Sequence, residues 1–312
     1  GNFLYKIELK APVYRKFDGE QGGAISTAQI PRVQVSNQSS WVGVLDVLVP
    51  KFQPPLNDPM PSEIGLIVDA AKAIPTIDER INLVVERLQQ AVRYTGEWSR
   101  AEGGLTPQSL SDMVRLKRAD SKDYAYLTSV ALRAAGVQAD VALVWKQNPT
   151  ERLFIEELPT TPAFESFNHA VVRVLDQGKT RFFDPSIPVV YTEGPLSDIQ
   201  GSWALTLTRV GSNFERVPIE SPLATSVRIS QIFDIRPDTS ISASGRVQVE
   251  GPMAAELKIL ALTQGQQQLE PYIRSLFGLA TKAPQIAPMM QIDNRDRRGR
   301  HFDINFSFVG TG

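Results

Sequence analysis

The feature that most constrains this fold is a change of hydrophobic period near residue 139. Between residues 62 and 135, apolar side chains recur every three or four positions, which is the spacing along one helix face. Beyond residue 139, short stretches alternate apolar and polar residues, as half-buried strands do. Helices followed by antiparallel strands favour an α+β fold.

Four helices are expected before that change, over residues 62–73, 76–95, 109–116 and 121–135. Thr76 and Glu79 have the spacing of a capping box, in which two side chains satisfy backbone N–H groups at a helix start. The last helix begins near Ser121 and ends at Gly136, because glycine readily adopts the left-handed conformation that terminates helices. Its apolar residues cover neighbouring faces, which predicts a buried helix.

Strands follow this helix in the sequence. Three are expected over residues 139–145, 169–175 and 180–184, and Gly178 predicts a hairpin between the last two. More strands are expected over residues 205–209, 226–235, 240–250 and 302–308, with one or two helices over residues 253–277. Residues 293–300 hold four arginines and are interpreted as a charged hairpin loop.

The segment before the helices has a different pattern. Its first residues, Phe3, Tyr5, Ile7 and Leu9, alternate with polar neighbours, and more short strands are expected up to a proline-rich linker over residues 53–61. A strand that begins this early suggests a β-domain cut in its middle. We therefore predict three parts: a partial N-terminal β-domain with its linker (1–61), a central domain (62–202) and a β-rich C-terminal domain (203–312).

Composition excludes several kinds of site. The 312 residues include no cysteine, which excludes disulfides, zinc–thiolate sites and thiol nucleophiles, and two histidines are too few for a His-rich metal site. The formal net charge of −1 gives no electrostatic argument for binding nucleic acid or an anionic membrane. The longest apolar helical stretch, 124–135, is interrupted by Arg133 and is too short to span a bilayer, so no transmembrane segment is expected.

Three positions could carry chemistry. Ser121 lies at a loop-to-helix junction, where backbone N–H groups and the helix dipole favour negative charge and can stabilise an oxyanion. His169 begins one strand of the hairpin and could act as general base and acid, and Asp184 ends the partner strand, where its carboxylate could orient the imidazole. Taken singly, each has a simpler structural role: a helix N-cap for Ser121, a strand histidine for His169 and a turn residue for Asp184.

These residues lie in three blocks that resemble the bacterial transglutaminase-like family, which is related to papain-type cysteine peptidases. The string ADSKDYAYLTSVALRAAG resembles that family's Gly-Asp-Cys-Lys-Asp block and the helix after it, with Ala119 in place of glycine and Ser121 in place of cysteine. FNHAVVRV, which contains His169, resembles the second block, and FFDPS, which contains Asp184, resembles the third. Softer similarities cover both flanks, so the resemblance extends over nearly the whole chain.

The resemblance implies a transglutaminase-like core over residues 62–202 and a cysteine-type acyl transfer on peptide or glutamine amides. Position 121 would attack the amide, His169 would move the proton and Asp184 would orient His169. Trp98 could line the cleft or donate to an oxyanion through its indole N–H, although a core aromatic is its simpler role. No metal or organic cofactor is implied, and the oligomeric state is left open. Relatives of this kind are usually exported, which implies a periplasmic or surface location and a peptide or protein as substrate or partner.

Ser121 departs from the family because a serine hydroxyl is not ionised near neutral pH and needs a base during attack. Three explanations are open: replacement of a cysteine in the laboratory, a natural pseudoenzyme whose cleft binds a peptide or protein, or a serine nucleophile. Ala119 favours natural divergence, whereas the retained His169 and Asp184 favour a site that was once active. The sequence thus predicts an inactive form of an acyl-transfer enzyme or, alternatively, a non-catalytic binding module.

Overall fold

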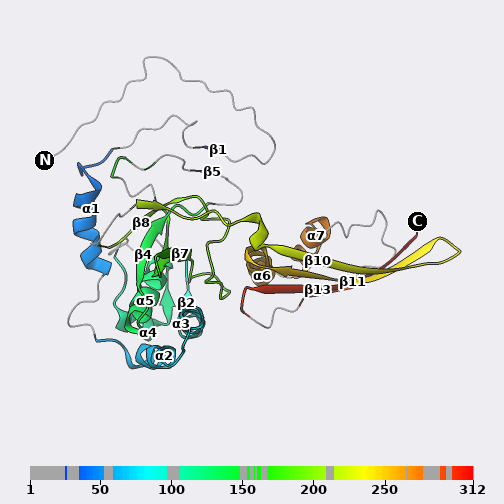
Figure 1. Cartoon of the computed structure of the whole chain (residues 1–312), viewed down its shortest axis with the longest axis horizontal. Helices are drawn as coiled ribbons and strands as arrows, with labels where there is room; N and C mark the ends of the chain where they lie inside the picture. The colour runs from blue at the N-terminus through cyan, green and yellow to red at the C-terminus, as the bar shows by residue number, and fades with distance from the viewer. Residues whose placement is uncertain are drawn as a thin grey trace, which may run out of the picture.

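The computed structural model describes residues 25–26, 35–52, 59–96, 106–147, 153–154, 158, 160–162, 167–208, 214–264, 266–276, 289–292 and 297–311. These residues form helices, two antiparallel sheets and two short parallel strand pairs, a mixed α+β arrangement. In Figure 1, a body of helices packed on one sheet continues into a second, longer sheet.

The body contains five helices and a five-stranded sheet. The helices are α1 (Trp41–Leu48), α2 (Ser62–Lys72), α3 (Ile77–Ala91), α4 (Leu110–Leu116) and α5 (Ser121–Ala134). The strands are β4 (Ala139–Val144), β6 (His169–Asp176), β7 (Lys179–Phe183), β8 (Trp203–Thr206) and β9 (Phe214–Arg216). Their order is β7-β6-β4-β8-β9, and every neighbouring pair is antiparallel. The two short pairs are β1 (Ile25–Ser26) with β5 (Leu153–Phe154) and β2 (Arg93–Tyr94) with β3 (Arg118–Ala119).

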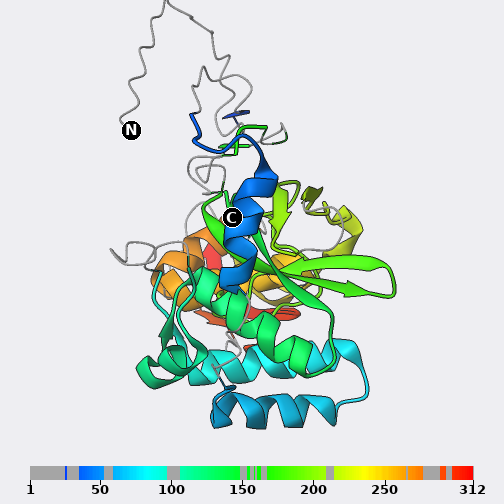
Figure 2. The ribbon, with the colours of Figure 1, turned by 90° about the vertical axis from the view of Figure 1, so that its left-hand side faces the viewer.

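Helix α5 is the central element of the body. All residues from Ser121 to Leu132 are buried, as expected for a helix covered on every side. It packs against β4 and β6 on one side and against α2 and α3 on the other, an arrangement visible in Figure 2. Along β6, Ala170 and Val172 belong to the core that α5 shares, whereas Val171 belongs to a smaller cluster on the opposite face of the sheet.

The predicted hairpin at Gly178 is present. Strands β6 and β7 pair from Val172 opposite Phe183 to Asp176 opposite Lys179. Gln177 and Gly178 both have positive φ, 47° and 80°, which is the turn geometry that matches the twist of two-residue hairpins. The hairpin therefore carries His169 and Asp184 at the end of the sheet opposite its turn.

The sequence prediction was wrong for residues 41–52, which were expected to form strands. They form α1 and a 3₁₀ turn (Val49–Phe52), and the Ser40 hydroxyl caps the helix at the Gly43 N–H. The i, i+3, i+4, i+7 spacing of Trp41, Val44, Leu45 and Leu48 explains the difference, since it builds one helix face that packs on the central core. The predicted alternation at residues 3–9 and the linker at 53–58 lie outside the described residues.

The C-terminal part forms its own sheet and core. Strands β10 (Ser226–Ile235), β11 (Ser240–Glu250), β13 (His301–Thr311) and β12 (Met289–Ile292) are arranged in that order and are antiparallel. Helices α6 (Pro252–Gln264) and α7 (Gln266–Leu276) pack beside them, and a 3₁₀ turn (Pro222–Ala224) precedes β10. Residues such as Val247, Leu257 and Phe302 form a hydrophobic cluster separate from that of the body.

The loop after β7 joins the two parts. Ile187, Val189 and Tyr191 pack against Ala255 of α6. The Val190 N–H donates to the Arg297 carbonyl at 2.8 Å, and the Gly299 N–H donates to the Val190 carbonyl at 2.9 Å. In the part of the chain that the structure describes, no helix is both long and apolar enough to cross a membrane.

Candidate functional site

The loop before α5 holds the helix start firmly. Asp120 caps the helix by accepting from the Asp123 N–H at 3.1 Å, and the Asp123 carboxylate accepts from the Asp120 N–H at 3.2 Å. Gln108 donates two further bonds to Asp123, and Lys122 pairs with the Asp120 carboxylate, both side chains being buried. Asp120, rather than Ser121, is therefore the N-cap, which corrects the simpler structural role considered for Ser121.

Ser121 occupies the first turn of α5 and is fully buried. Its Oγ has no hydrogen-bond partner among the described residues, a property shared on this helix by Thr128 and Ser129. An unsatisfied buried hydroxyl costs about 1–3 kcal/mol, whereas a cysteine thiol behaves as a small hydrophobic group with weak hydrogen-bonding needs. The surroundings of position 121 thus suit a thiol better than a hydroxyl.

His169 and Asp184 form a close pair at the end of β6 and β7. His169 Nε2 lies 2.7 Å from Asp184 Oδ2, and both side chains are buried. Asp184 Oδ1 accepts from the backbone N–H of Ser186 at 2.9 Å and from its hydroxyl at 2.6 Å. The Lys146 ammonium donates to Asp184 Oδ2 at 2.7 Å and lies 3.3 Å from Asp198. Both carboxylate oxygens are therefore fully engaged.

Charge keeps Asp184 ionised despite its burial. Burial alone raises the pKa of a carboxyl group, but the charges and hydrogen bonds of His169 and Lys146 outweigh it and hold the pKa of Asp184 well below its ordinary value. Burial lowers the pKa of Lys146, and the nearby Asp184 and Asp198 outweigh that effect and raise it above its ordinary value. Because Asp184 is ionised and can only accept, His169 donates to it through Nε2.

His169 forms a hydrogen bond with Asp184, but Ser121 forms none with His169. His169 lies opposite Val144 and alternates with Ala170, so it belongs to the sheet face opposite the one that α5 covers. Tyr94 is close both to the residues before α5 and to Asp184. Strand β2 pairs it with Ala119. Burial raises the pKa of Tyr94, and the negative charges of Asp184 and Asp120 raise it further.

Lys146, Ser186 and Tyr94 are site residues that the sequence prediction missed. Lys146 lies 38 residues before Asp184, which hides their contact in the sequence. Ser186 lies two residues after Asp184 and makes a local contact that the sequence prediction did not consider. Tyr94 lies just beyond α3, and the sequence prediction assigned it no role. Trp98, the predicted cleft or oxyanion residue, lies outside the described residues.

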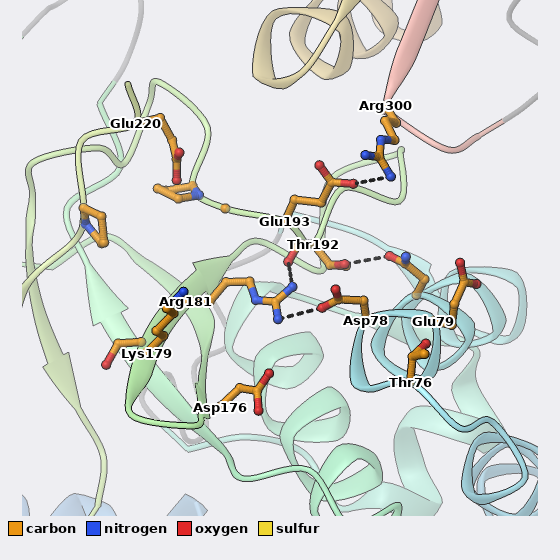
Figure 3. Close-up of a pocket in the computed structure, with 15 residues that line it drawn as sticks. Thr76, Asp78, Glu79, Asp176, Lys179, Arg181, Thr192, Glu193, Glu220 and Arg300 are labelled. Carbon is orange, nitrogen blue, oxygen red and sulfur yellow. Dashed lines mark hydrogen bonds and ion pairs between the residues drawn. The ribbon is translucent and has the colours of Figure 1, made fainter. Parts of the chain in front are cut away.

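A polar cavity of about 700 Å³ lies at the other end of the hairpin, beside its turn residues Asp176 and Lys179 (Figure 3). Its charged side chains largely pair with one another, as Arg181 does with Asp78 at 2.8 Å and Arg300 with Glu193 at 3.4 Å. Among the described residues, no group of three or more histidine and acidic side chains could hold a metal ion. The described residues around this cavity include no histidine, and the cavity lies at the hairpin end opposite His169.

The chain has a distant structural likeness to a solved protein. No family model matches the chain, and no curated protein matches it. Among solved structures, it is similar to a crystal structure from Parabacteroides distasonis described as a putative protease, with 12% sequence identity and a TM-score of 0.45. The match covers 88% of this chain and 53% of the other, so this chain spans about half the length of that protein. The site must therefore be judged on its own geometry.

Replacing Lys146 with methionine is expected to lower the free energy of unfolding by about 1.5 kcal/mol at pH 7, because a hydrogen bond to a charged group contributes about this much. Urea denaturation of both proteins measures the difference. Lys179→Met, which removes an exposed lysine that makes no ion pair among the described residues, is the matched control and should change stability by less than about 0.5 kcal/mol.

The difference in unfolding free energy between the parent chain and Lys146→Met should depend on pH. The pKa of Asp184 is lower in the folded chain than its ordinary value of 3.8, so its stabilising contribution is present above that pH and is lost as pH falls further. The pKa of Lys146 is higher than its ordinary value of 10.5, so its contribution is present below that pH and is lost as pH rises through the folded value. The Lys146→Met difference should therefore be flat between these limits and shrink beyond each. A difference that instead varies steadily across neutral pH would show that another group governs it.

Proposed function

We propose that this chain has a transglutaminase-like, papain-type site for acyl transfer on peptide or glutamine amides, in a form that lacks its cysteine nucleophile at position 121. The observation that carries the proposal is the 2.7 Å hydrogen bond between His169 and an ionised, buried Asp184. The boundaries of the core at 62–202 and an exported, periplasmic or surface location belong to the proposal and are supported by the sequence resemblance.

The chemistry proposed for a cysteine at position 121 follows from these groups. Its thiolate would attack the amide carbonyl, and N–H groups at the start of α5 would donate to the developing oxyanion. His169 would give a proton to the departing amine, leaving a thioester at position 121. Water or an amine would then attack the thioester and lose its proton to His169, while Asp184 holds the imidazole in one orientation.

Serine does not complete this cycle in the arrangement described. Its hydroxyl must lose a proton during attack, and Ser121 Oγ makes no hydrogen bond to His169 that could transfer it. A thiol at the same position ionises more readily at a helix start and near an imidazole. We therefore expect the chain with Ser121 to show no acyl-transfer activity.

A burst assay with p-nitrophenyl acetate tests the proposal. Ser121→Cys should release about one p-nitrophenolate per chain in a rapid first phase, because the ester acylates the new thiol. The parent chain should give no burst. Ser129→Cys is the matched control, since Ser129 is a buried, unpartnered hydroxyl on the same helix. Equal behaviour of the two cysteine variants would contradict a nucleophile site at position 121.

The alternative is a non-catalytic module that binds a peptide or protein in the former cleft. Ser121 is fully buried and makes no hydrogen bond to His169, and both observations favour this alternative. Restoring the cysteine distinguishes the two: an acyl-transfer site regains a burst, whereas a binding module whose site has diverged does not.

A further inference from the structure

A second cavity, of about 870 Å³, lies directly beside the candidate site. Tyr94, Lys146 and Ser186 line it. Lys146 and Ser186 donate hydrogen bonds to the Asp184 carboxylate, at 2.7 and 2.6 Å. The wall of this cavity, which we name the basic groove, is thus one side chain away from the His169–Asp184 pair.

The basic groove is positively charged. Arg93, Lys117 and Arg297 line it, all three are exposed, and none makes an ion pair with a described residue. Lys146 adds little, because Asp184 and Asp198 balance its charge. Of the residues that the structure describes, no aspartate or glutamate lines the groove. An occupant that brings negative charge would therefore gain three unpaired cations, in a concave site where fields are strengthened.

The lining also includes apolar side chains, in a wall that hydrogen bonds hold in place. Ile187 and Pro188, from the loop after Asp184, line the groove together with Ile259 of α6. The Gln89 amide fixes that loop by donating to the carbonyls of Pro185, Ile187 and Val189, at 3.3, 2.9 and 3.2 Å. The groove therefore offers apolar surface as well as charge, in a wall that is already shaped.

We propose that the basic groove binds an acidic peptide segment carrying an apolar side chain, and that this is the substrate class of the site. The choice of a peptide rests on the proposed function, whereas the negative charge follows from Arg93, Lys117 and Arg297. An apolar side chain would lie against Ile187 and Ile259, and acidic neighbours would pair with the three cations.

Fluorescence anisotropy with the chain as it is, carrying Ser121, tests this inference. The probes are labelled short peptides in which leucine is flanked by glutamate, by glutamine or by lysine. The glutamate peptide should bind about tenfold more tightly than the glutamine peptide, and its affinity should fall as salt is added. The lysine peptide should not bind. Equal affinity for the glutamate and glutamine peptides would overturn the inference.

Two double variants with the same change in net charge locate the site. Arg93→Glu with Arg297→Glu should abolish the preference for glutamate. Arg228→Glu with Arg236→Glu, on exposed parts of the C-terminal sheet and its turn, should leave it unchanged. Circular dichroism checks folding, and Arg93→Gln with Arg297→Gln is the milder substitute, which should remove most of the preference. A preference that survives both groove variants would show that the peptide binds elsewhere.

A labelled single-stranded oligonucleotide is the last probe in the anisotropy measurement. Groove-dependent binding of this probe at least as tight as that of the glutamate peptide would replace the peptide by a nucleic acid and overturn the inference. Peptide binding is measured on the chain that carries Ser121, so the result of the binding experiment does not depend on the burst assay. An acidic-peptide preference without a burst in Ser121→Cys would leave a binding groove and reject acyl transfer, and the reverse result would reject only the substrate class.

Discussion

Replacing Asp184 with alanine is expected to lower the free energy of unfolding by about 3 kcal/mol at pH 7. Removing one member of a buried charged network leaves its partners without a counter-charge, and such changes cost about 3–5 kcal/mol. Here the change removes the acceptor of His169, Lys146 and Ser186 together. We expect the lower part of the range because Lys146 still reaches Asp198 and is partly exposed to water.

Urea denaturation followed by circular dichroism measures this effect, with Asp176→Ala as the control. Asp176 is a carboxylate at the turn end of the same hairpin and makes no ion pair among the described residues, so its loss should cost less than about 0.5 kcal/mol. Asp184→Asn keeps the shape and one acceptor oxygen, so it should fall between the two. If Asp184→Ala were as stable as Asp176→Ala, the network would contribute nothing to the fold.

Much of the fold could be predicted because its elements are bounded by local signals. The predicted spans 226–235 and 240–250 match β10 and β11, since alternation runs through both strands and a turn at residues 236–239 separates them. The buried helix was predicted from apolar residues covering neighbouring faces, and Gly136, with φ of 83°, follows its end as expected. Gly178 likewise located the hairpin turn.

Other elements depend on contacts that the sequence does not display. Residues 41–48 sit among predicted strands, and their helix is stabilised by packing on Phe167 and Phe214, far along the chain, with which Trp41 makes edge contacts at 5.7 and 5.2 Å. Thr76 stands at the predicted N-cap position, yet its side chain makes no capping bond. Local pattern predicted the position of α3 correctly but not the absence of a capping bond at its start.

In the candidate site, too, some features follow from local sequence and others from tertiary contacts. The hairpin fixes where His169 and Asp184 lie, so their proximity could be anticipated from sequence order alone. Lys146 could not be anticipated, because its approach to Asp184 depends on the pairing of β4 with β6 and not on local pattern. The resemblance predicts that Ser121 and His169 act together, but sequence order does not show which face of the sheet a strand residue shares with a helix.

The basic groove could not be predicted from the sequence either. Its cations come from three separate parts of the chain: Arg93 in β2, Lys117 after α4 and Arg297 before β13. The sequence showed the arginines of residues 293–300, which were interpreted as a charged loop, and gave no sign that Arg297 joins cations from the body. Only the folded arrangement turns three scattered charges into one surface.

The most direct test of the central claim is the rate at which iodoacetamide alkylates Ser121→Cys as a function of pH. A thiol at a helix start that forms an ion pair with His169 has a strongly lowered pKa. At pH 6 we expect alkylation at least about tenfold faster than in Ser129→Cys, the equally buried control, and we expect His169→Ala to remove the advantage. Rates that match the Ser129→Cys control and ignore His169→Ala would contradict an acyl-transfer site at the start of α5.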